Sequence, residues 1–340
     1  MFRKNRAIVN VLKSTPICKI LARLSPSIIT TGATESINIG HSSKLSFSTD
    51  KAHFSQYITE QRGCLYDKSY RLYLKNANDY VISPFHDVPL HAENNIYNMV
   101  VEIPRWSNAK MEICTDEKMN PIKQDVKKGQ LVFVANCFPH NGYLWNYGAL
   151  PQTWEDPSYV DSSTGTKGDG DPIDVCEIGS KIHSTGSIIK VKLLGILALI
   201  DEGETDWKII CIDISDPLST QLNTIEDIEK TMPGLLKSTV RWFKMYKTPF
   251  GSPPNRFAFD EKIMDHVFAN TIVKEVHKQW KKLVLEKSDT SVRIERASHL
   301  FESPYKVSAI EASETLQLHP AKGNPKIYGA AVNKWHYIMQ

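Results

Sequence analysis

The stretch that decides the reading of this chain is Lys167-Gly168-Asp169-Gly170-Asp171-Pro172-Ile173-Asp174. It places three carboxylates within six residues, and the glycines and proline around them are typical of a tight turn. Carboxylates this close repel one another, so they stay ionised together only if cations lie among them. On a strand, Asp169 and Asp171 would face the same side, and Pro172 would turn the chain so that Asp174 can join them.

A second acidic cluster follows an apolar, strand-like run, and it reads Asp201-Glu202-Gly203-Glu204-Thr205-Asp206-Trp207-Lys208. Sets of oxygen ligands suit hard cations such as Mg2+, which usually keeps several waters and completes its shell with substrate phosphates. A single acidic turn is most often a solvated loop. Two such clusters in one chain predict a site that binds several Mg2+ ions and transfers phosphoryl groups.

Both clusters belong to a longer series of motifs. The others are Phe85-His86-Asp87-Val88-Pro89-Leu90, Val101-Glu102-Ile103-Pro104-Arg105-Trp106, Asn136-Cys137-Phe138-Pro139 and Tyr147-Gly148-Ala149-Leu150-Pro151-Gln152-Thr153-Trp154-Glu155-Asp156-Pro157. In this order they resemble the eukaryotic branch of the soluble family I inorganic pyrophosphatases, from about Phe85 to Leu285. The resemblance implies Mg2+-dependent hydrolysis of inorganic diphosphate to two phosphates by direct attack of a metal-activated water, with about three to four Mg2+ ions per active site.

The same resemblance implies roles for individual residues. The metal-binding carboxylates would be Asp169, Asp174, Asp201, Asp206 and Glu112. Asp171 would be the general base beside the attacking water. The groups expected to contact the phosphates are Lys110, Tyr147, Lys208, Tyr246 and Lys247. Tyr143 would line the site, and the acids expected to orient ligands and waters are Glu102, Asp125, Glu155 and Glu177.

One position departs from the family pattern. Where the family usually has an arginine that contacts phosphate, this chain has Val132, and no neighbour obviously replaces it. A charge-assisted hydrogen bond of this kind contributes about 1.5–3 kcal/mol, which corresponds to about 10- to 100-fold in rate or binding. We therefore expect a working but slower enzyme, or one that needs more metal or substrate. Gly170 in place of the usual Asn is a milder change, because Gly also tolerates the turn.

The elements expected from the pattern are strands followed by helices. The strand-like runs are Asn98 to Ile103, Lys110 to Ile113, Gln130 to Ala135, Ile188 to Ile200 and Trp207 to Ile214. A capping box at Thr224 to Asp227, a helix opened by Pro233 and an amphipathic helix within Lys262 to Glu286 follow. We expect an α+β, mainly β fold, and the resemblance implies an OB-like five-stranded barrel with flanking helices.

Residues 1–48 differ in composition from the rest. They hold seven Lys or Arg and a single acid, Glu35, so the remainder of the chain carries a net charge of −3. This predicts a mitochondrial targeting leader and a matrix enzyme, with a disordered basic tail of a cytoplasmic protein as the alternative. Residues 49–340 would form one catalytic domain. The acidic remainder argues against direct nucleic-acid binding.

Neither the cysteines nor the hydropathy points to another class of protein. The six cysteines show no paired spacing, which favours buried thiols in a reduced compartment. The longest apolar run, Leu193 to Ile200, is too short for membrane insertion. His86 and His140 are expected to form hydrogen bonds rather than to bind metal.

Two alternatives to an enzyme that works on its own remain open from the sequence. Val132 allows a catalytically weakened paralogue that acts as a binding module, because OB-like barrels also serve binding. An active enzyme recruited as a subunit into a larger assembly is the other. The resemblance also implies a homodimer.

Overall fold

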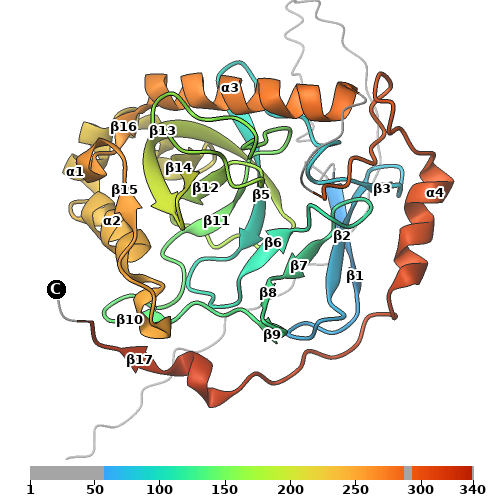
Figure 1. Ribbon diagram of the computed structural model, residues 1–340, viewed down its shortest axis with the longest axis horizontal. Helices are drawn as coiled ribbons and strands as arrows, with labels where there is room; N and C mark the ends of the chain where they lie inside the picture. Colours follow the sequence, from blue (N-terminus) through green and yellow to red (C-terminus); the bar gives the residue numbers. More distant parts are fainter. Residues whose placement is uncertain (1–56, 287–292, 339–340) are drawn as a thin grey trace, which may run out of the picture. The chain divides into compact units, whose positions relative to one another are not determined.

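The computed structural model describes residues 57–286 and 293–338, and the predicted leader lies outside these ranges (Figure 1). At the centre of this part, five strands form a closed ring of hydrogen-bonded neighbours. In ring order they are β5 (Ile96–Ile103), β11 (Asn146–Ala149), β12 (Asp174–Glu177), β14 (Glu204–Asp213) and β13 (Ile188–Asp201). β13 closes the ring because it also pairs with β5, from Ile188 opposite Val100 to Val191 opposite Tyr97. The OB-like five-stranded barrel is thereby confirmed.

Alternate residues of the barrel strands pack into two different hydrophobic clusters. Val175 and Ile209 belong to a cluster that includes Ile272 and Val276 of α3 (His266–Leu285). Cys176 and Ile210, their neighbours in sequence, lie in the cluster that includes Trp242 and Phe243 of α2 (Leu235–Met245). Because side chains alternate between the two faces of a strand, one face of the barrel sheet packs in the cluster with α3 and the other face packs in the cluster with α2.

The predicted helices form, with shifts at their starts. α1 (Ile225–Thr231) has the expected capping box between Thr224 and Asp227. The prediction that Pro233 opens the next helix is wrong, because Gly234, with φ 87°, is the residue before the first turn of α2. α3 begins after the predicted Lys262, because β16 (Met264–Asp265) first pairs with β13.

A second sheet lies beside the barrel. Its strands are β1 (Tyr57–Arg62), β2 (Arg71–Asn76), β3 (Val81–Ile82), β6 (Met111–Ile113) and β7 (Ile122–Gln124). The strand predicted over Gln130 to Ala135 is wrong in length, since only β9 (Gln130–Leu131) pairs with β8 (Val126–Lys127). The remaining strands are β4 (His91–Glu93), β10 (Asn136–Cys137), β15 (Arg256–Phe257) and β17 (Trp335–His336).

Beyond α3 the sequence pattern predicted no element, yet the chain is ordered into short ones. α4 (Ala309–Glu314) has a capping box formed by Ser308 and Glu311, and it buries Ala312 against Tyr73 and Val81 of the second sheet. Single turns of 3-10 helix occur at Pro217–Thr220, Thr248–Phe250, Phe259–Glu261, Thr315–Leu318 and Ala330–Asn333. Within the described ranges, no helix has the length and apolar character that a membrane crossing requires.

The described cysteines are unpaired, and those on the barrel strands are buried, as expected of structural thiols. His86 is fully buried, and both of its ring nitrogens have hydrogen-bond partners. Nε2 lies 2.9 Å from the carbonyl oxygen of Glu295, and Nδ1 accepts from the indole Nε1 of Trp280 at 3.0 Å. The expectation of a hydrogen-bonding histidine is confirmed here.

Burial lowers the pKa of His86 to about 4, so this ring stays neutral in the folded protein. In the unfolded chain it gains a proton near its ordinary pKa of about 6.5. The contribution of the neutral His86 to the free energy of unfolding is therefore fully present above pH 6.5, and it is lost as the pH falls toward 4. We expect this loss to reach about 3 kcal/mol.

Urea unfolding between pH 7 and pH 4.5 measures the loss. In His86→Gln, which cannot titrate, the free energy of unfolding should be lower at pH 7 but should fall less steeply with acid. Parallel pH dependences in the variant and the wild type would show that His86 is not the group responsible.

Candidate active site

Two neighbouring strands bring the acidic motifs together. Asp174 opens β12 and lies opposite Lys208 of the parallel strand β14. Asp206 and Lys208 stand two apart on β14 and therefore share a face, while Trp207 between them packs into the cluster of α3. The buried ammonium of Lys208 donates hydrogen bonds to Asp174 and Asp206, and at 3.0 Å to the hydroxyl of Tyr147. Tyr147 in turn donates to Asp174.

The Asp169 to Asp171 segment is a bend, in agreement with the turn that its glycines and proline predicted, so the shared face that a strand would give does not apply. Gly170 has φ 90°, and the amide of Asp171 donates back to the Asp169 carboxylate at 3.0 Å. Gly168 lies so close to the backbone of Glu155 that a Cβ there would meet its carbonyl oxygen at 2.4 Å. Both glycines thus let the loop fold onto Glu155 and turn its carboxylates toward β14.

One group of carboxylates has the spacing of a metal site. Single oxygens of Glu155, Asp169 and Asp206 all lie within 4.8 Å of one another. Glu155 accepts from the Trp207 amide at 3.1 Å through Oε1, whereas its buried Oε2 has no hydrogen-bond partner. Burial and mutual repulsion raise the pKa of all three carboxyls well above the ordinary range. The group therefore fits a hard divalent cation, which would replace the protons that these acids otherwise hold.

Asp171 is accessible to solvent, but the protein atoms packed around its carboxyl reduce its hydration, and other acids lie nearby. Desolvation raises the pKa of its carboxyl to about 7, with help from Glu112, Asp174 and Asp206 and opposition from Lys110. A carboxylate with a pKa near neutrality is well suited to accept a proton.

Lys110 and its partners form the side of the site next to β6. The ammonium of Lys110 lies 2.9 Å from Glu112 and 3.0 Å from Asp125. Lys110 directly precedes β6, and it shares a face with Glu112 as the alternation predicted. Glu102 on β5 is buried and accepts from the Ile113 amide at 2.7 Å. Desolvation and the nearby Asp174 raise the pKa of the Glu102 carboxyl well above its ordinary value.

The third part of the site joins the end of β13 to the end of α2. Lys247 contacts both carboxylate oxygens of Asp201, at 2.5 and 2.6 Å, and the hydroxyl of Tyr246 donates to the same carboxylate at 3.3 Å. Lys247, expected to contact the phosphates, is thus paired with an acid of the second cluster.

An aromatic layer under these groups was missed by the sequence reasoning. Trp242 stacks on Tyr246 at 4.8 Å and lies 4.9 Å from Tyr143, and its indole donates to the Gly142 carbonyl at 2.8 Å. Phe243 lies beneath the Lys208 ammonium at 5.6 Å. The four-residue spacing from Trp242 to Tyr246 on a helix was the signal that could have shown this contact.

Glu177 lies apart from the other predicted site residues. It closes β12 at the end opposite Asp174, and it accepts from Asn146, from the Gly179 amide at 2.6 Å and from the Asp213 amide at 3.0 Å. None of these partners is a predicted site residue. In the structure Glu177 fixes the chain at the far end of the barrel strands.

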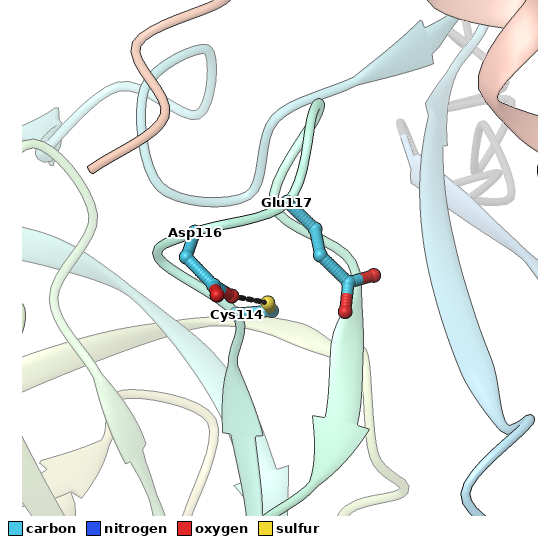
Figure 2. A group of neighbouring side chains, drawn as sticks. All are labelled: Cys114, Asp116 and Glu117. Atoms are coloured by element: carbon cyan, nitrogen blue, oxygen red, sulfur yellow. Dashed lines mark hydrogen bonds between the residues drawn. The ribbon is translucent and has the colours of Figure 1, made fainter. Parts of the chain in front are cut away.

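A separate group with metal-like spacing comprises Cys114, Asp116 and Glu117 (Figure 2). The thiol donates to Asp116 at 2.9 Å, and burial raises the pKa of Cys114 to about 12. Lys123 contacts both carboxylates, at 3.3 and 3.2 Å, and Arg71 pairs with Glu117 at 2.5 Å. Two cations thus neutralise the two acids, and this group is an ion-pair network rather than a metal site.

Comparison with known proteins shows to which family this chain belongs. A family profile described as inorganic pyrophosphatase matches residues 99–281. An inorganic pyrophosphatase of Drosophila melanogaster is 48% identical over 94% of this chain and 95% of its own length. Inorganic pyrophosphatase 2, mitochondrial, of Mus musculus is 45% identical over 84% of this chain and 91% of its own length. The structure of inorganic pyrophosphatase from Schistosoma japonicum matches with a TM-score of 0.78 and 49% identity, over 83% of this chain and all of that one. This chain belongs to the inorganic pyrophosphatase family.

Proposed function

We propose that this chain hydrolyses inorganic diphosphate to two phosphates in a Mg2+-dependent reaction. The observation that carries the proposal is the convergence of Glu155, Asp169 and Asp206 with the buried Lys208 on one face of the barrel. Such a site offers oxygen ligands to cations and ammonium donors to phosphate oxygens. Family membership supports the same reaction.

Mg2+ bound among Asp169, Asp174, Asp201, Asp206 and Glu112, in about three to four positions, would neutralise the substrate and make water more acidic. Asp171 would accept the proton of the attacking water at a carboxylate oxygen. The exposed Asp171 carboxylate can reach solvent, and its raised pKa lets it take up a proton near neutral pH.

The cationic and phenolic groups would bind the two phosphates. Lys110, Lys208 and Lys247 each contact carboxylates in the structure, and phosphate oxygens are chemically equivalent acceptors for them. Burial, together with nearby acids, raises the pKa of Tyr147 and Tyr246 well above the ordinary value, so both hydroxyls stay protonated and can donate. Glu102 and Asp125 would orient ligands and waters, and Tyr143 would line the site. Glu155, expected to do the same as Glu102, would in addition offer an oxygen to the cation beside Asp169 and Asp206. Glu177 would support the site only indirectly, by fixing the far end of β12.

Direct attack by water predicts that no phosphorylated protein forms. The purified chain, given 32P-labelled diphosphate and Mg2+ and then quenched in acid, should yield labelled inorganic phosphate and an unlabelled protein. Label that stays with the protein, or no labelled phosphate at all, would contradict the proposal.

The Val132 position gives a further prediction. The Val132 carbonyl accepts from the Lys110 amide at 3.1 Å and from the Gln124 side chain at 2.7 Å, so its backbone adjoins the site. Val132→Arg should therefore raise kcat or kcat/KM by about 10- to 100-fold. Steady-state kinetics at several Mg2+ concentrations measure the gain, with Val126→Arg on the neighbouring strand β8 as a control. No gain would show that Val132 does not limit the enzyme.

We also propose that residues 1–48 target the protein to the mitochondrial matrix and that residues 49–340 form one catalytic domain. The basic composition of the leader and the similarity to a mouse protein named as mitochondrial support this. A fluorescent fusion of residues 1–50 should enter mitochondria. A cytoplasmic fusion would favour the basic-tail alternative.

A homodimer completes the proposal. The exposed aromatic side chains Trp106, Phe138, Trp335 and Tyr337 offer apolar surface for such a contact. Phe138 lies 6.1 Å from Trp335 and 5.4 Å from Tyr337, so three of them form one patch. Sedimentation velocity should show a dimer, and Phe138→Glu should shift it to monomer.

A further inference from the structure

The last described part of the chain, residues 320–338, runs without sheet structure until β17 and contains one 3-10 turn, Ala330–Asn333. It is here named the C-terminal strap. In Figure 1 it is the red segment that runs from α4 past β9 to β17. Its first part is held by backbone hydrogen bonds near the end of β1. The Gly63 amide donates to Pro320 at 2.9 Å, the Gly323 amide to Gly63 at 3.0 Å and the Lys326 amide to Leu65 at 2.8 Å.

The other end of the strap is held at β10. Trp335 and His336 form β17, which pairs in parallel with Asn136 and Cys137. The Phe138 amide donates to the His336 carbonyl at 2.9 Å. Two separate sets of backbone hydrogen bonds thus fix the strap on either side of its middle.

Between these two anchors, Tyr328 packs its ring against two aromatic side chains. Its ring centroid lies 4.7 Å from Tyr66 in an edge-to-face arrangement and 5.2 Å from Phe133. The preceding residue, Ile327, is fully exposed. Tyr328 is therefore a side chain through which the strap contacts the underlying structure, and edge-to-face aromatic contacts stabilise such packing beyond the buried area.

Phe133 connects this contact to the site. Phe133 lies opposite Ala109 in a β-bridge. The residues before and after Phe133 are hydrogen-bonded to the residues on either side of Ala109. The Val134 amide donates to Asn108 at 2.8 Å, and the Lys110 amide donates to Val132 at 3.1 Å. The Val132 amide donates to Asp125 at 2.9 Å. A shift of Phe133 must therefore move the backbone that holds Lys110 and Asp125, whose side chains pair at 3.0 Å.

We propose that Tyr328 is a positioning residue for the Lys110 side of the active site. It acts through Phe133, and its aromatic ring rather than its hydroxyl carries the effect. The inference rests on the proposed function, because it takes Lys110 as a group that binds phosphate. Small displacements of positioned groups are costly in catalysis, so loss of the ring should lower kcat/KM although Tyr328 never meets the substrate.

The first arm of the test compares four single variants and one double variant of the full chain, assayed for diphosphate hydrolysis at saturating Mg2+ and well below their unfolding midpoints. Tyr328→Ala should lower kcat/KM by about 10-fold. Tyr328→Phe keeps the ring and should stay within about twofold of the wild type. Ile327→Ala, the matched control beside it, should do the same. Phe133→Ala should behave like Tyr328→Ala, and combining the two should lower kcat/KM no further, because both remove the same contact.

The outcomes separate the inference from the proposed function. A Tyr328→Ala variant that unfolds at lower temperature but keeps wild-type kcat/KM would overturn the inference, since the ring would then serve stability alone. Additive losses in the double variant would also overturn it. Lys110→Met is the second arm. If it keeps wild-type kcat/KM, the assignment of Lys110 to the site fails, and the inference fails with it.

Discussion

Asp171→Asn should lower diphosphate hydrolysis by about 10²- to 10⁴-fold, the usual contribution of a positioned acid or base. The amide keeps the shape of the side chain but cannot accept a proton. Asp171 is exposed in the bend after Gly170, so its replacement breaks no core packing. It also removes one of several mutually repelling carboxylates. The thermal midpoint in EDTA should therefore be unchanged or higher, while activity is lost.

Glu204→Gln is the matched control for this variant. Glu204 belongs to the second acidic cluster, but it is exposed at the start of β14 and lies outside the predicted site. Its replacement should leave kcat within about twofold of the wild type. If Asp171→Asn retains the activity of Glu204→Gln, another group accepts the proton and the assigned role is wrong.

Lys208→Met should have the largest effect on stability. Lys208 is 3% exposed and is shared by Asp174 and Asp206, so its loss leaves two carboxylates without their cation. Breaking a buried pair in this way typically costs about 3–5 kcal/mol. Mg2+ should raise the stability of this variant more than that of the wild type. In the wild type, the ion and the Lys208 ammonium compete for the same two carboxylates, and in the variant that ammonium is gone. Hydrolysis should nevertheless fall by about 100-fold or more, as a donor to phosphate is lost.

Thermal unfolding in EDTA and in Mg2+ tests this account, together with phosphate release. Lys190→Met on β13 is the control, because Lys190 also pairs with an acid, Glu93, at 2.8 Å, but both are exposed. Such a surface pair contributes about 0–1 kcal/mol. An equal midpoint for Lys208→Met and wild type in EDTA would show that the buried ammonium does not hold the acids together.

The long barrel strands were predicted from the sequence pattern, whereas the five-stranded barrel and the roles of the acidic residues were implied by the family resemblance. β13 and β14 are long and mostly buried strands. Their buried backbone amides and carbonyls need hydrogen-bond partners, which neighbouring strands supply. The prediction was weakest where pairing is short. β11 and β12 have four residues each, and they carry Asn, Tyr, Gly, Asp and Glu in place of an alternating apolar pattern. Their pairing in the ring is set by the longer strands on either side.

Contacts between distant segments were beyond the sequence pattern. Nothing local indicates that Trp242 supports Tyr143, or that Tyr328 packs on Phe133. The extended strap has no periodicity of its own, and it is held by hydrogen bonds to Gly63 and Leu65, which a pattern search cannot pair. Lys247 likewise gained its partner, Asp201, only once the end of α2 was placed beside β13.

The central claim is that the carboxylates of this barrel hold Mg2+ for diphosphate hydrolysis. The most direct measurement is phosphate release from diphosphate by the purified full-length chain, stripped with EDTA and then given increasing Mg2+. The account predicts no release without the metal and a rise to a plateau as Mg2+ is added. No release at any Mg2+ concentration, from a protein shown to be folded, would contradict it and favour the binding-module alternative.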